Sequence, residues 1–107
     1  MKVTAWNNGK HSSSGAGYGL KLAATDRDHF FYKSWEVVSI KLPNGKVTQV
    51  NIDKASFWGS TCRELIDQKI GQWLIEARKA PWPSGSPPKF ELVPKLKGHF
   101  ELREIET

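Results

Sequence analysis

Residues 7–17 (NNGKHSSSGAG) combine the backbone and the side chains that could bind a phosphate group. Their glycines let backbone N–H groups approach an anion closely, and Lys10 and His11 add basic side chains. Asn7 and Asn8 have amide groups of the kind that reads the edges of bases. The same composition is equally typical of a surface loop of eleven residues that binds nothing. Both interpretations stay open.

Cys62 is the residue whose expected position best favours nucleophilic chemistry. A helix predicted over residues 62–79 places its thiol in the first turn, where the helix dipole favours a thiolate. His11, His29 or His99 could then act as the base. However, no histidine or acid stands at a spacing typical of a cysteine enzyme, and a small inert cysteine explains the residue better. We therefore predict no catalytic residue and no enzymatic activity.

The sequence also predicts no metal and no cofactor. The single cysteine excludes an internal disulfide and a cysteine-rich zinc site. The three histidines are scattered, and the acids of the run 26–29 (DRDH) fit the start of a helix better than a metal site. The glycines of residues 15–19 (GAGYG) have neither the dinucleotide-binding spacing nor the Gly-Lys-Ser/Thr ending of a P-loop.

Trp82 lies in a proline-rich segment, residues 81–88 (PWPSGSPP). Prolines on both sides hold its ring on a stiff, extended stretch of backbone. Such a ring could stack on a base, a sugar or a peptide of a protein partner. The favoured alternative is a hydrophobic clasp in which the ring folds back over the predicted helix.

Lysines surround a predicted β-hairpin. Lys41 and Lys46 flank its turn, residues 43–45 (PNG), and Lys33 and Lys54 lie just outside its strands. A two-stranded ribbon that carries lysines can enter a groove of DNA. Lysines also protect solvated sheet edges against aggregation, which is the commoner role.

The overall charge favours an anionic partner. The chain of 107 residues has a formal net charge of +5. Residues 1–60 contain eight Lys and Arg against four acids, whereas residues 61–107 contain eight against seven. The excess therefore lies in the N-terminal half. No apolar run approaches the roughly 18 residues that a membrane span needs, and the N-terminus lacks a signal-peptide core, so we expect a cytoplasmic protein without membrane contact.

The elements that must position these residues follow from hydrophobic periodicity and turn signals. A short helix is predicted from an N-cap at Thr25 to Phe31, and a long helix behind a capping box formed by Thr61 and Glu64. The long helix has an apolar stripe made of Ile66, Ile70, Trp73, Leu74 and Ala77. Strands are predicted around residues 2–6, 18–23, 36–42, 46–52, 90–93 and 100–102.

These elements predict a single domain over residues 1–107 of the α+β class. Its mostly antiparallel sheet of about six to seven strands is expected to curl into an open barrel, accompanied by one short and one long helix. Gly71 inside the long helix costs about 1 kcal/mol relative to alanine, which indicates that another segment packs closely against it.

Two resemblances accompany this interpretation. The first is to a family of small uncharacterised prokaryotic proteins and is carried by the runs GAGYGLKL, DRDHFF, SFW, CREL, IGQWL and PWPSGSPPKF. The second is weaker: the order of elements is similar to that of the DNA-binding pseudobarrel superfamily. It implies an open barrel of about seven strands with helices at its ends and basic loops that grip the major groove. Residues 7–17 and the hairpin turn would be the counterparts of those loops.

The resulting expectation is a small nucleic-acid-binding module, with duplex DNA as the partner. Phosphates would be contacted by lysines, and base edges by polar groups of the N-terminal loop. The candidate residues are Asn7, Asn8, Lys10, His11, Lys21, Lys33, Lys41 and Lys46. The alternative is a protein-interaction domain that binds its partner through Trp82 and segment 81–88.

Overall fold

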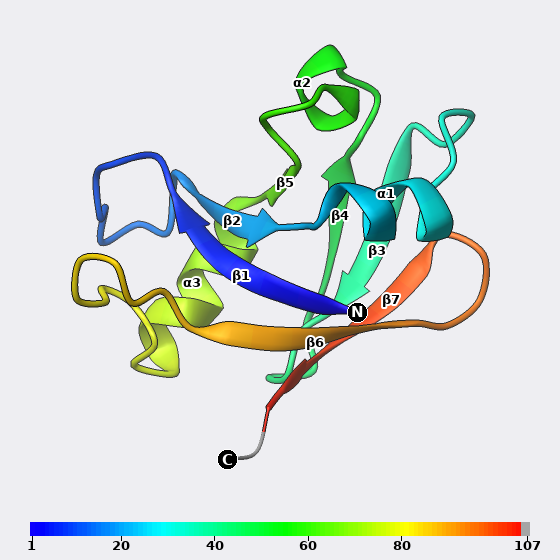
Figure 1. Ribbon diagram of the computed structural model, residues 1–107. Helices are drawn as coiled ribbons and strands as arrows, with labels where there is room; N and C mark the ends of the chain where they lie inside the picture. The colour runs from blue at the N-terminus through cyan, green and yellow to red at the C-terminus, as the bar shows by residue number, and fades with distance from the viewer. Residues whose placement is uncertain (106–107) are drawn as a thin grey trace.

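Seven strands form one mixed sheet in the computed structural model, which describes residues 1–105 (Figure 1). The order of strands in the sheet is β4-β3-β7-β6-β1-β2-β5, and only β3 and β7 pair in parallel among them. The strands are β1 (Lys2–Asn7), β2 (Tyr18–Lys21), β3 (Val37–Lys41), β4 (Val47–Asn51), β5 (Glu64–Ile66), β6 (Lys89–Pro94) and β7 (His99–Glu104).

The two edge strands, β4 and β5, approach each other, so the sheet nearly closes into a barrel. The Thr48 hydroxyl of β4 donates a hydrogen bond of 2.6 Å to the carboxylate of Asp67, the residue just beyond β5. This arrangement confirms the predicted α+β class and the curled, mostly antiparallel sheet. Within the described residues, three helices accompany the sheet: α1 (Ala24–Phe30), α2 (Ala55–Trp58) and α3 (Gln68–Glu76).

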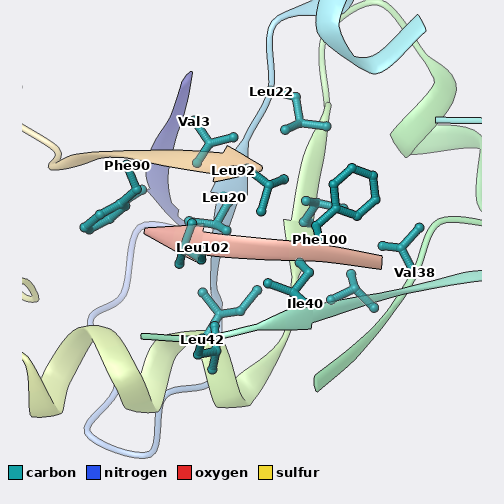
Figure 2. Packing of buried hydrophobic residues seen from close by; sticks show 14 of the residues in the cluster. Val3, Leu20, Leu22, Val38, Ile40, Leu42, Phe90, Leu92, Phe100 and Leu102 are labelled. Carbon is teal, nitrogen blue, oxygen red and sulfur yellow. The ribbon is translucent and has the colours of Figure 1, made fainter. Parts of the chain in front are cut away.

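The core fills the inside of the barrel because strand residues alternate between the two faces of the sheet (Figure 2). At one end the buried ring of Phe31, which follows α1, stacks on Phe100 with ring centroids 4.7 Å apart. At the other end Trp73 of α3 meets the edge of Phe90 at 5.1 Å. We call these the α1 end and the α3 end of the barrel. The strand residues inside include Val3, Leu20, Val38, Ile40, Val50, Phe90, Leu92, Phe100 and Leu102.

The β3–β4 hairpin forms as predicted from the alternation of its strands. Its turn is closed by the backbone N–H of Leu42, which donates to the Lys46 carbonyl at 2.8 Å, and by that of Gly45, which donates to Leu42 at 2.9 Å. Gly45 has a φ of 87°, the left-handed conformation that glycine adopts without strain. This is a three-residue connection in which only the glycine needs a positive φ.

The prediction of one helix over residues 62–79 is wrong in its first part. Residues 64–66 form β5, because Leu65 pairs with Leu20 and is fully buried against β2. The helix begins only after Asp67, whose carboxylate accepts a hydrogen bond of 2.9 Å from the backbone N–H of Lys69. Asp67 is therefore the N-cap. The Thr61–Glu64 capping box does not form, because Glu64 instead accepts from the backbone N–H of Arg63.

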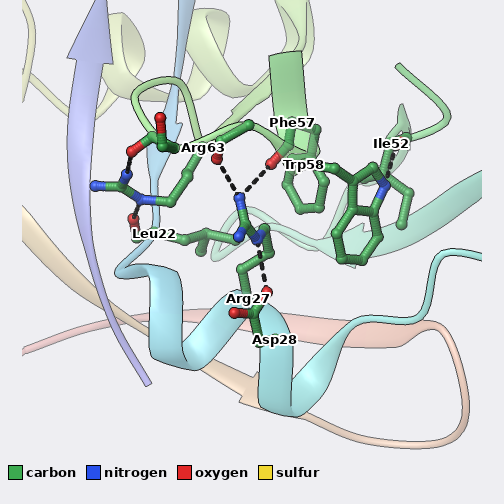
Figure 3. A network of polar contacts seen from close by, with 9 residues as sticks. Leu22, Arg27, Asp28, Ile52, Phe57, Trp58 and Arg63 are labelled. Atoms are coloured by element: carbon green, nitrogen blue, oxygen red, sulfur yellow. Dashed lines mark hydrogen bonds and ion pairs between the residues drawn. The ribbon is translucent and has the colours of Figure 1, made fainter. Parts of the chain in front are cut away.

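Two smaller features also differ from the prediction. Helix α1 has Ala23 at its N-cap, without a side-chain hydrogen bond, and Thr25 lies inside the first turn. The four-residue helix α2 was not predicted. It is held to α1 by the buried guanidinium of Arg27, which donates to the carbonyls of Phe57 (3.0 Å) and Gly59 (Figure 3). These charge-assisted bonds tie residues 57–59 to helix α1.

Candidate nucleic-acid interface

The N-terminal loop, residues 7–17, is organised by its own asparagines. The Asn7 carboxamide oxygen accepts from the backbone N–H of Gly9 at 2.9 Å, and its amide nitrogen donates to the carbonyl of Lys10 at 2.8 Å. The Asn8 side chain accepts from the backbone N–H of Lys10 at 3.1 Å. Both side chains therefore fold the loop, as asparagine does in Asx turns, and have fewer groups left for a base edge.

The loop is also anchored on helix α3. The Gln68 amide donates to the carbonyl of Ser14 at 3.0 Å. At Gly71, an added Cβ would lie only 2.0 Å from the carbonyl oxygen of Gly15, so the loop backbone runs directly against the helix. This is the close packing that the helical glycine indicated. The loop is thus a fixed platform at the α3 end of the barrel.

His11 and Trp82 pack together beside this loop. His11 Nδ1 lies 2.7 Å from the hydroxyl of the buried Tyr18, and the Trp82 ring meets the His11 ring edge-on at 4.9 Å. Trp82 is half-buried and packs against the core, in keeping with a hydrophobic clasp. Its aromatic neighbours are His11 and Tyr18, the second with its ring centroid 5.8 Å away.

Burial raises the pKa of the Tyr18 phenol above its ordinary value of about 10. The folded protein therefore keeps this proton when the unfolded chain loses it, so the contribution of Tyr18 to stability should be constant up to about pH 10 and fall above that pH. A Tyr32→Phe variant leaves Tyr18 as the sole tyrosine. We expect its ultraviolet absorbance to titrate above pH 10 in the native state. Titration at or below that pH would show that the phenol is accessible to water.

The five predicted phosphate-binding lysines lie at different places on the barrel. Among residues 1–105, none of the five forms an ion pair with a carboxylate, because the ion pairs found there involve other cations. Lys10 and Lys46 are exposed on the N-terminal loop and at the hairpin turn. Lys33 lies near the α1 end, with its ammonium 5.8 Å from the centre of the Trp58 ring. Lys21 is half-buried at the end of β2.

Lys41 lies beside a glutamate of the neighbouring strand, which makes it a weaker candidate for a phosphate contact. Lys41 is in register with Glu101 on β7. The pKa of the Glu101 carboxyl lies below its usual range, mainly because Arg103 hydrogen-bonds to it, and Lys95 and Lys41 lower it further. Part of the Lys41 charge is thus already offset by a carboxylate, so Lys46 is the better candidate of the hairpin.

Helix α3 brings the loop and the hairpin together, and it adds a lysine that the sequence did not single out. Gln68 contacts Ser14 of the loop, and the preceding Asp67 contacts Thr48 of the hairpin. Lys69 follows in the same turn, is exposed and has no ion pair within residues 1–105. Nothing in the local sequence marked it, because the predicted helix began at residue 62 and placed Lys69 in its middle.

The remaining candidates for chemistry are isolated. Cys62 is exposed in the loop before β5, not at a helix start, and its thiol accepts from the Thr61 hydroxyl at 3.9 Å. Over residues 1–105, no cluster of three or more His, Cys, Asp or Glu side chains could hold a metal ion. No helix in that range combines the length and the apolar character needed to cross a membrane.

Comparisons with known proteins identify no relative, so the chain can be classified only by its fold. No protein-family model, no curated protein and no solved structure matches it significantly. The resemblance to a family of small prokaryotic proteins therefore gains no support. The nearly closed sheet is compatible with a pseudobarrel, and the chain is an α+β protein with a barrel-like sheet.

Proposed function

We propose that this protein is a nucleic-acid-binding module that contacts the phosphates of duplex DNA through the α3 end of its barrel. The observation that carries the proposal is the convergence of the N-terminal loop and the β3–β4 hairpin on the first turn of α3. Lys10, Lys46 and Lys69 extend from these three segments and have no ion pair among residues 1–105. Free lysines on a rigid platform suit a row of phosphates.

The internal hydrogen bonds of the loop favour contacts with the DNA backbone over the reading of sequence. The Asn7 and Asn8 amides are engaged within the loop, and His11 is held by Tyr18. Phosphate contacts fix the position of a protein on DNA but carry no sequence information. We therefore propose binding with little preference for sequence, in which Lys41 and Lys21 play smaller parts and Lys33, near the α1 end, lies outside the interface.

The alternative, a protein-interaction domain built on Trp82, has less support. A binding hot spot needs a ring that a partner can cover. The Trp82 ring is half-buried against the core and contacts His11 and Tyr18. That packing accounts for the proline-framed tryptophan without a partner.

Matched charge variants test the proposed interface. The double variant Lys10→Ala/Lys46→Ala removes two charges at the α3 end, whereas Lys2→Ala/Lys97→Ala removes two exposed lysines of β1 and of the turn between β6 and β7, which have no ion pair among residues 1–105. Binding of a labelled duplex should weaken in the first variant, and its salt dependence should flatten by about two units of slope. The second variant should bind nearly like the wild type. Equal losses in both would show that only net charge matters, and would contradict the interface.

A further inference from the structure

A cleft of about 530 Å³ opens at the α1 end of the barrel, away from the proposed duplex interface. One wall comes from the end of α1 and the segment that leads to β3. The other wall comes from the turn between β6 and β7, which lies beside α1 in Figure 1. Its volume is within the range of about 300–1,000 Å³ that is typical of ligand sites. The aromatic and basic residues that matter in its lining are His29, Phe30, Tyr32, Trp35, Lys97 and His99.

One aromatic ring of this cleft, that of Tyr32, lies largely outside the core. Phe31 turns inward and stacks on Phe100, whereas the neighbouring Tyr32 side chain is 57% exposed. The Tyr32 ring meets the half-buried Trp35 ring edge-on, with centroids 4.9 Å apart. Trp35 therefore supports a ring that is more than half exposed and accessible to a flat partner. Aromatic rings held in this way form the stacking platforms of proteins that bind single strands.

The basic residues that line the cleft favour an anionic partner. Two lysines and two histidines line it, and no Asp or Glu does so. Lys97 is exposed without an ion pair among residues 1–105, while Lys95 lies 4.0 Å from Glu101. Lys33, the residue next to Tyr32, lies outside the cleft, with its ammonium 5.8 Å from the centre of the Trp58 ring. The lysines of the cleft are therefore Lys95 and Lys97, both on the wall formed by the turn between β6 and β7.

We propose that this cleft binds single-stranded nucleic acid, with one base stacked on Tyr32 and the neighbouring phosphates held by Lys97 and Lys95. The aromatic platform accounts for the base, and two lysines along one wall account for an extended backbone rather than a lone nucleotide. The proposal does not depend on duplex binding at the α3 end, because the two sites share none of the residues assigned to them.

The test compares a labelled single strand of about ten thymidine nucleotides with an abasic strand of equal length and charge. The wild type should bind the thymidine strand much more tightly. Tyr32→Ala should weaken that binding by about 5- to 150-fold, the range for a lost base stack, and Tyr32→Phe should retain most of it. Because the Tyr32 side chain is largely exposed, both variants should keep the wild-type thermal midpoint.

A charge-matched pair and two further ligands complete the experiment. Lys97→Ala should weaken binding of the thymidine strand, whereas Lys89→Ala, at the other end of β6, should not. The double variant Lys10→Ala/Lys46→Ala should also leave it unchanged, which separates this site from the duplex interface. Equal affinity for the abasic strand, or wild-type affinity in Tyr32→Ala, would overturn the proposal. Binding of thymidine monophosphate or of an acidic peptide as tightly as the strand would overturn it as well.

Discussion

Gly71→Ala should destabilise the protein by about 3 kcal/mol or more, even though alanine is the better helix former. The alanine gains about 1 kcal/mol of helix propensity. Against this gain, its Cβ would lie 2.0 Å from the carbonyl oxygen of Gly15 and 2.7 Å from that carbonyl carbon. These are backbone atoms of an anchored loop, so no side chain can rotate away to relieve the contact. The free-energy cost of this clash must therefore exceed the gain in helix propensity.

Chemical denaturation of the variant checks this expectation, with Gly59→Ala as the matched control. At Gly59 the backbone φ is −78°, and an added Cβ would meet its nearest neighbour, the Ala55 carbonyl oxygen, at 3.4 Å. The control should therefore stay close to the wild type. If Gly71→Ala were as stable as the wild type, the N-terminal loop would not lie against α3, and the platform for the lysines would be lost with it.

Trp73→Ala should cost about 3–5 kcal/mol, the range for removing a large buried aromatic side chain. Trp73 is 4% exposed and packs edge-on against Phe90 at the α3 end of the core. A domain of this size is stabilised by about 5–15 kcal/mol, so the loss takes up much of the total. Trp73→Phe retains a ring and should lose clearly less.

Thermal unfolding followed by circular dichroism measures both variants, and Leu96→Ala serves as the surface control because Leu96 is 80% exposed. Leu96→Ala should shift the midpoint little. A near-native midpoint for Trp73→Ala would mean that α3 presents a different face to the sheet.

The sequence predicted the parts of the fold that local pattern determines. Alternating apolar residues and an Asn-Gly turn specify the β3–β4 hairpin, since both signals lie within one short segment. The boundary at residues 64–67 could not be found in this way. Ile66, Ile70 and Trp73 are spaced as on a helix, but Leu65 pairs with Leu20, far away in the chain. Long-range pairing overrides the local period there.

The candidate site was predictable only in part, for a similar reason. The composition of residues 7–17 indicated a loop, and Gly71 indicated a close contact, but neither identified Gly15 as the partner. The asparagines could have been interpreted as loop-forming residues, because Asn side chains commonly bond to the backbone two residues on. The distribution of lysines between the two ends of the barrel depends on tertiary structure and has no local signal.

The most direct test of the central claim is the affinity of the wild-type protein for duplex DNA as a function of salt. If the α3 end neutralises about four phosphates, log K should fall with log salt at a slope of roughly −3.6. Replacement of Lys10, Lys46 and Lys69 by alanine should flatten that slope by about one unit for each true contact. Absence of duplex binding at about 150 mM salt, or an unchanged slope in the triple variant, would contradict the proposed function.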